Sequence, residues 1–158
     1  MKLSTVFFVA NILLLGFIWG FTIYSYSDLP EIVPTHFAVN GTVNGEDHKK
    51  TIWFLPAIAS FIFLLLTGIP RNPDSPMLNV PKSFRNKEKL KVFSYSILCV
   101  MLILLADTVV ESILIAQGKL NEMSNAVFFL LPLLLFTIGI HIYRMIREGR
   151  RETLNLNN

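Results

Sequence analysis

The sequence contains a single cysteine, Cys99, which lies inside a long apolar run. One cysteine excludes an intramolecular disulfide, and its apolar surroundings offer no cation to stabilise a reactive thiolate, so Cys99 is expected to be a small packing residue. Charged residues are also scarce. They make up 16% of the 158 residues, whereas 53% are apolar. Such a composition is hard to reconcile with a surface that faces water on all sides.

Sequence patterns that usually accompany catalysis are missing as well. There is no serine nucleophile with a matching base, no glycine-rich phosphate loop and no His-Glu-x-x-His pattern. We therefore expect a non-enzymatic protein without a cofactor. The net charge of +3 and the pI near 9.1 could suit nucleic acid. However, the basic residues cluster beside apolar runs and not along one amphipathic face, so nucleic-acid binding is not expected.

What the chain has in abundance is long apolar runs, four in all, at about residues 4–26, 51–69, 92–115 and 125–143. Each is close to the roughly 20 residues that a helix needs to cross about 30 Å of hydrocarbon. The first run is longer than the core of a cleaved signal peptide, so we expect it to remain a helix. The sequence predicts an all-α membrane protein, a single domain over residues 1–158 with transmembrane helices at about residues 4–26, 51–69, 86–116 and 125–145.

The basic residues predict how these helices thread through the bilayer. Eleven of the fourteen Lys and Arg residues fall in the N-terminus, the middle loop and the C-terminus. By the positive-inside rule, both termini and the middle loop are then cytoplasmic, and the loops at about residues 27–50 and 117–124 face outward. The eleven residues are Lys2, Arg71, Lys82, Arg85, Lys87, Lys89, Lys91, Arg144, Arg147, Arg150 and Arg151.

The two loops next to the second helix have different character. Four prolines at positions 70, 73, 76 and 81 predict an irregular inner loop, after which Ser83 or Asn86 can cap the third helix. In the outer loop, Asn40-Gly41 separates two β-prone segments, residues 35–39 and 42–43. This pattern favours a short extracellular β-hairpin with a two-residue turn between the first two helices. A lone hairpin is marginal in water, so it should rest on the helix ends or the membrane.

Asp107 and Glu111 are the strongest anomaly, because their four-residue spacing places two carboxyls on one face of an apolar helix. Each acid near the bilayer centre costs roughly 2.5–3.5 kcal/mol on insertion scales, so both need a partner or a wet cavity. We hypothesise a polar outer vestibule in which Lys49 or His36 meets Glu111. The pair could be structural, pinning the outer loop to the bundle; it could belong to a ligand, proton or ion pathway; or it could lie near the surface by chance.

Four other features of the sequence carry structural expectations. Glu46, Asp47, His48 and His36 could in principle converge on a metal, but neighbouring loop residues point in different directions, so no metal site is expected. The pattern Gly16-x-x-x-Gly20 allows close helix approach, either within the bundle or in a homodimer. Asn11 is expected to make an interhelical hydrogen bond, and Pro132 to kink the fourth helix.

The outer loop carries a recognisable motif: Pro34-x-His36-Phe37, then Gly41, then Lys49. Over about residues 15–65 the chain resembles the bacterial membrane family known as domain of unknown function 1648. The resemblance implies a bacterial plasma membrane protein with an outer motif at Pro34, His36, Phe37, Gly41 and Lys49. Some relatives are SdpI-type immunity proteins, in which a further multi-helix region follows this domain; here the chain is expected to end after four helices.

These observations lead to a ranked set of functional expectations. The first is a signal-sensing or immunity-like factor, in which the outer motif with Asp107 and Glu111 binds an extracellular peptide, toxin or cation. The alternatives are a small proton- or cation-coupled transporter component and a structural subunit of a membrane complex. The expected partners are the lipid bilayer, the extracellular peptide and a second copy of the chain.

Overall fold

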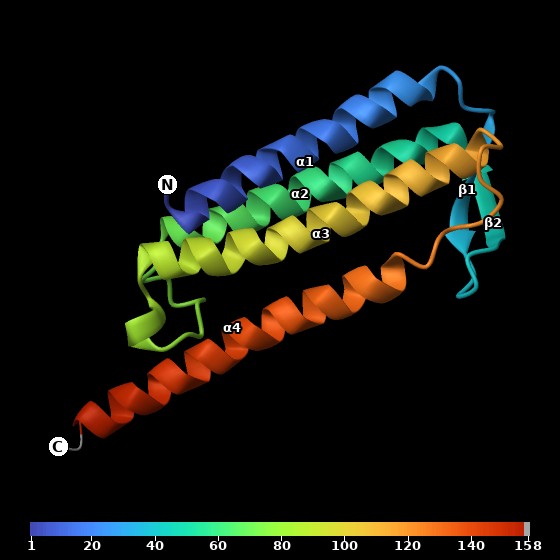
Figure 1. Cartoon of the computed structure of the whole chain (residues 1–158). Helices are drawn as coiled ribbons and strands as arrows, with labels where there is room; N and C mark the ends of the chain where they lie inside the picture. Colours follow the sequence, from blue (N-terminus) through green and yellow to red (C-terminus); the bar gives the residue numbers. More distant parts are fainter. Residues whose placement is uncertain (157–158) are drawn as a thin grey trace.

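The computed structural model describes residues 1–156 and contains four helices that are long and apolar enough to cross a membrane (Figure 1). They are α1 (Leu3–Tyr26), α2 (Phe54–Gly68), which reaches spanning length over Lys49–Arg71, α3 (Lys87–Ala116) and α4 (Val127–Leu156). Short 3-10 turns, η1 (Lys49–Trp53) and η2 (Ile69–Arg71), extend α2 at its two ends, and η3 (Lys82–Phe84) precedes α3. The predicted four-helix fold with a hairpin after the first helix is confirmed, whereas the orientation of the termini stays a prediction.

Helices α1, α2 and α3 lie side by side, and α4 diverges from them (Figure 1). In the most apolar stretch of α3, 44% of the residues are buried, against 6% in α4, so α3 forms the centre of the fold. The core is small, as expected when the outer faces of the helices meet lipid and not water. Its members include Ile18, Ala59, Leu98, Leu102, Val109 and Ile113.

Polar side chains join α3 to its neighbours inside the bundle. The Nδ2 of Asn11 donates to the carbonyl of Tyr95 at 2.9 Å, which confirms the expected interhelical hydrogen bond. The hydroxyl of Ser4 donates to the carboxylate of Glu88. Between α1 and α2, the Nε1 of Trp19 donates to the hydroxyl of Ser60 at 2.9 Å. Each contact satisfies a polar group that lipid could not satisfy.

The two ends of the bundle differ in charge. The N-terminus, the proline-rich loop and the far end of α4 lie together at one end, here named the termini end, and the hairpin lies at the other, the hairpin end (Figure 1). Eleven of the fourteen Lys and Arg lie at the termini end, with only four of the eleven Asp and Glu. At the start of α3, Asn86 accepts hydrogen bonds from the amides of Glu88 and Lys89, which confirms it as the cap.

Helix α4 runs to Leu156 and does not end near residue 145 as predicted. Its polar extension contacts the loop before α3, because the Nζ of Lys89 lies 2.6 Å from the carboxylate of Glu148 and the amide of Ser83 donates to Glu152 at 3.3 Å. One turn into the apolar part, the hydroxyl of Ser96 shares a 2.8 Å hydrogen bond with the Nε2 of His141. These tertiary contacts stabilise the polar end of α4 as a helix. Because they are tertiary, the hydropathy of the sequence does not predict them.

The hairpin consists of β1 (Ile32–Phe37) and β2 (Val43–His48), which pair antiparallel from Ile32 opposite His48 to Phe37 opposite Val43. It is longer than predicted. The turn also differs, because the Ala38 amide donates to the Thr42 carbonyl at 2.8 Å across a three-residue loop. Of the three loop residues 39–41, Gly41 alone has a positive φ, as in a type I turn followed by a left-handed residue. Leu29 and Val33 join the buried core, so the hairpin rests on the bundle as expected.

Candidate functional site

The tip of the hairpin docks on the linker between α3 and α4 through Gly41. The carbonyl of Gly41 accepts a hydrogen bond from the amide of Met123 at 2.9 Å. Gly41 has a φ of +86°, and a Cβ at this position would lie 2.4 Å from the carbonyl oxygen of Met123. Both the backbone conformation and the close approach therefore require glycine here. Gly41 of the outer motif therefore fixes the hairpin tip against the α3–α4 linker.

Behind this contact lies a cavity of about 340 Å³ between the hairpin tip, α3, the linker and the start of α4, here named the hairpin cavity. It brings together the outer motif and the acidic pair, because Phe37 and Gly41 line it from the hairpin while Asp107 and Glu111 line it from α3. The remaining lining residues are largely apolar: Ala38, Val39, Leu104, Thr108, Met123, Ser124, Val127 and Phe128.

Glu111 is buried, with 8% of its surface exposed, and its Oε2 accepts a hydrogen bond from the amide of Ser124 at 2.9 Å. The carboxylate thus holds the α3–α4 linker against α3. The hypothesis that Lys49 or His36 meets Glu111 is wrong, since neither residue lines the hairpin cavity and Lys49 pairs with Glu31 instead. Glu111 is a structural acid that also forms part of the cavity wall.

Lys49 is held locally because the strand register places it beside Glu31. The Lys49 amide donates to the Glu31 carbonyl at 2.8 Å, and its Nζ lies 2.9 Å from the Glu31 carboxylate. The Nε2 of His48 approaches the same carboxylate at 3.3 Å. The hydrogen bond and the charge of Lys49 lower the pKa of Glu31 below its ordinary value. This cluster closes the base of the hairpin.

Asp107 lies one helical turn deeper than Glu111, half-buried in the wall of the hairpin cavity. Within residues 1–156 its carboxylate makes neither a hydrogen bond nor an ion pair. It is the free acid of this cavity, in contrast to Glu111, whose carboxylate already has a partner. A cationic or hydrogen-bond-donating group that enters the cavity would meet Asp107 inside a largely apolar enclosure, where charge–charge attraction is stronger than in water.

Two other motif residues, Pro34 and His36, line a second cavity, of about 310 Å³, on the far side of Phe37. Pro34 and His36 line it with Asp47, Ser112 and the start of α2, while Phe37 and Thr108 line both cavities. His36 lies opposite Gly45, where an added Cβ would come within 2.9 Å of the His36 Cβ. Gly45 could not be identified from the sequence, because Asn44-Gly45 has the pattern of a turn. In the structure it lies in β2 and leaves space for the side chain of His36 on the opposite strand.

Two further expectations concern metals and helix packing. In the part of the chain that the structure describes, no group of three or more His, Cys, Asp or Glu residues is placed to hold a metal ion, so Glu46, Asp47, His48 and His36 do not converge. Gly16 and Gly20 are exposed, and an added Cβ at either position would meet no atom within 4 Å. Among the described residues, nothing therefore packs against these two glycines.

Comparisons with known proteins agree with the motif and add no activity. The family model described as Domain of unknown function (DUF1648) matches residues 13–59, which include most of α1, the whole hairpin and the first part of α2. An uncharacterized protein of Archaeoglobus fulgidus is 30% identical over 89 residues, an alignment that covers 51% of this chain. The chain matches only 48% of the length of that relative. No solved structure matches the chain.

Proposed function

We propose that this chain is a non-enzymatic membrane protein of a bacterial plasma membrane that senses an extracellular peptide, or protects its cell from one. In this proposal the hairpin cavity receives a cationic group of the peptide. The observation that carries it is the convergence of Phe37 and Gly41 with Asp107 and Glu111 around one cavity of about 340 Å³. A concave, mostly apolar site with a few polar groups is the usual form of a binding site.

The charge asymmetry supports an extracellular position for this cavity. The termini end holds eleven of the fourteen cations, and by the positive-inside rule that end is cytoplasmic. The hairpin end, which holds seven of the eleven acids, then faces outward. A net negative outer end attracts positively charged peptides by long-range electrostatics. Orientation and charge therefore favour the same class of ligand.

The composition of the cavity favours a peptide side chain over a bare metal ion. Divalent cations such as Ca²⁺ take six or more oxygen ligands, whereas this cavity offers one unpaired carboxylate, on Asp107, and the partnered Glu111. Most of the other lining residues are apolar, including Leu104, Val127 and Phe128. A lysine or arginine side chain with an adjoining apolar residue matches both the single free charge and the apolar walls.

A complementation experiment tests this proposal. A strain without the gene is challenged with the peptide fraction of culture supernatants from competing strains, and its growth is compared with that of strains complemented with wild type or variants. Wild type should restore resistance, and Asp107→Asn should not. The matched control is Asp74→Asn, which removes the same charge from an exposed position in the proline-rich loop. Equal sensitivity of the deleted and wild-type strains would contradict the proposal.

A second function deserves a direct test because Asp107 and Glu111 line one cavity inside a membrane-spanning helix. Intramembrane acids of this kind often belong to proton or cation pathways. Purified protein is reconstituted into vesicles that contain a pH-sensitive dye, and proton flux is followed after a pH jump. Flux that Asp107→Asn abolishes and Asp74→Asn preserves would favour transport. Absence of flux in wild type would favour the binding proposal, and failure of both assays would favour a structural subunit.

A further inference from the structure

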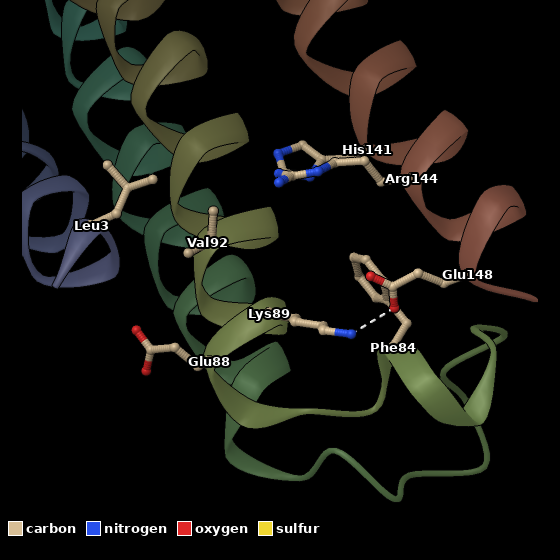
Figure 2. A pocket seen from close by; sticks show the side chains of 8 residues that line it. All are labelled: Leu3, Phe84, Glu88, Lys89, Val92, His141, Arg144 and Glu148. Atoms are coloured by element: carbon tan, nitrogen blue, oxygen red, sulfur yellow. Dashed lines mark hydrogen bonds and ion pairs between the residues drawn. The ribbon is translucent and has the colours of Figure 1, made fainter. Parts of the chain in front are cut away.

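A further cavity lies at the termini end, remote from the hairpin, and has a different chemistry. It has a volume of about 250 Å³ and is formed where the start of α1, η3 and the start of α3 meet α4 (Figure 2). Three of the residues that line it are apolar, namely Leu3, Phe84 and Val92. The others are polar or charged: Glu88, Lys89, His141, Arg144 and Glu148. We name it the termini cavity.

Of the charged residues that line this cavity, the exposed Arg144 makes neither a hydrogen bond nor an ion pair within residues 1–156, whereas the others each have a partner. Lys89 and Glu148 neutralise each other across 2.6 Å, and Glu88 accepts the Ser4 hydroxyl while pointing away from the gap between α3 and α4 (Figure 2). Arg144 extends from α4 into that gap, and no ion pair within residues 1–156 involves it. An arginine with no acid partner beside an apolar cavity suits a phosphate, because guanidinium donates two parallel hydrogen bonds to its oxygens.

The depth of the cavity points to a lipid as the source of that phosphate. Val92 is the first residue of the apolar part of α3, directly after Lys91, and Arg144 directly follows the apolar part of α4. From Val127 to Arg144 the helix rises about 26 Å, close to the thickness of a hydrocarbon core. The cavity therefore lies where head groups meet acyl chains. Val92 lies one turn further into the apolar part of α3 than Glu88 and Lys89, on the side of the acyl chains.

We propose that the termini cavity binds the phosphodiester head group of one anionic phospholipid, with Arg144 as the main phosphate donor and an acyl chain against Leu3 and Val92. Three observations carry this: the unpaired guanidinium, the apolar wall beside it, and the excess of eleven cations over four acids at this end. Basic pockets between helices at a membrane surface are known to hold anionic head groups. The site is independent of the function proposed for the hairpin cavity.

Native mass spectrometry of the full-length protein in mild detergent tests the proposal, with phosphatidylglycerol and phosphatidylcholine of identical chains as probes. Wild type should bind one phosphatidylglycerol more tightly than any phosphatidylcholine. Arg144→Gln should weaken the phosphatidylglycerol complex about tenfold or more, as expected for the loss of a charge-assisted hydrogen bond. The matched control is Arg150→Gln, which removes an exposed cation of the same helix outside the cavity and should leave binding unchanged.

A second variant keeps the charge and changes only the space. Val92→Phe places a larger side chain in the apolar wall and should also weaken phosphatidylglycerol binding, with Arg144 intact. Equal losses in Arg144→Gln and Arg150→Gln would overturn the proposal, because they would indicate general attraction by surface charge. Inorganic phosphate that binds in the absence of lipid with the same dependence on Arg144 would also overturn it, since the site would then serve free phosphate.

Discussion

Replacing Gly41 with alanine should release the hairpin tip from the α3–α4 linker. The substitution has three costs. A left-handed φ of +86° costs a residue with a Cβ roughly 1–2 kcal/mol. The new Cβ would lie 2.4 Å from the Met123 carbonyl oxygen, so the tip must move. That movement breaks the hydrogen bond from the Met123 amide, which contributes about 1 kcal/mol. The total is about 2–4 kcal/mol, localised at the hairpin cavity.

Gly118 provides a matched control for this prediction. It has a φ of +69°, close to that of Gly41, but an added Cβ would meet no atom within 4 Å. Gly118→Ala therefore carries only the backbone cost of roughly 1–2 kcal/mol. The difference between the two variants isolates the contact between the hairpin tip and the linker from the strain of a positive φ.

Hydrogen exchange of the Met123 amide, measured on protein in nanodiscs, tests this comparison. In Gly41→Ala the local loss of about 2 kcal/mol or more should speed exchange at Met123 roughly thirtyfold or more. In Gly118→Ala exchange at Met123 should stay close to that of wild type. If both variants change the exchange rate of the Met123 amide equally, or if neither changes it, then the hairpin tip does not hold the linker. The hairpin cavity would then not be closed on that side.

Two further predictions concern the acids at the hairpin end. Glu111→Ala should leave the Ser124 amide without its partner and lower the free energy of unfolding by about 1–3 kcal/mol, whereas Glu122→Ala, at an exposed linker position, should change it little; thermal unfolding in detergent compares them. Because Lys49 lowers the pKa of Glu31, the stabilisation from this pair is fully present above the ordinary value of 4.5 and is lost as the pH falls through the lowered pKa. The melting temperatures of wild type and Glu31→Gln should therefore converge upon acidification below that range, and a difference that is independent of pH would contradict the assigned ion pair.

The fold was predictable to the extent that it depends on hydropathy. Apolar runs of transmembrane length locate all four helices, and Asn86 is found as a cap because its side chain satisfies amides that the helix leaves free. The end of α4 was not predictable. Its polar residues up to Leu156 stay helical because Glu148 and Glu152 contact the segment that leads into α3, a tertiary effect without a local signal.

The candidate site was predictable only in part, for reasons that lie in the hairpin. The spacing of Asp107 and Glu111 correctly places both on one face, and both line the hairpin cavity. The partner of Lys49 was mispredicted because nearby Glu31, aligned by the strand register, competes with the more distant Glu111. The position of His36 depends on irregularities in the strand pairing on both sides of it, which shift the register and are not encoded in a residue pattern.

The hydrogen bonds of helix α4 to the rest of the fold are unevenly distributed along its length. In the described chain, the hydrogen bonds from α4 to other elements are all made by His141 or by residues after it. The start of α4 follows the α3–α4 linker, which Gly41 and Glu111 hold through hydrogen bonds. A rod of 30 residues is about 45 Å long. If it pivots near one end, a tilt of about 5° displaces the opposite end by about 4 Å, with little disturbance of α1, α2 and α3. A force on the linker would therefore displace the start of α4 by several ångströms, while the end of α4 that contacts α3 and the loop before it stays in place.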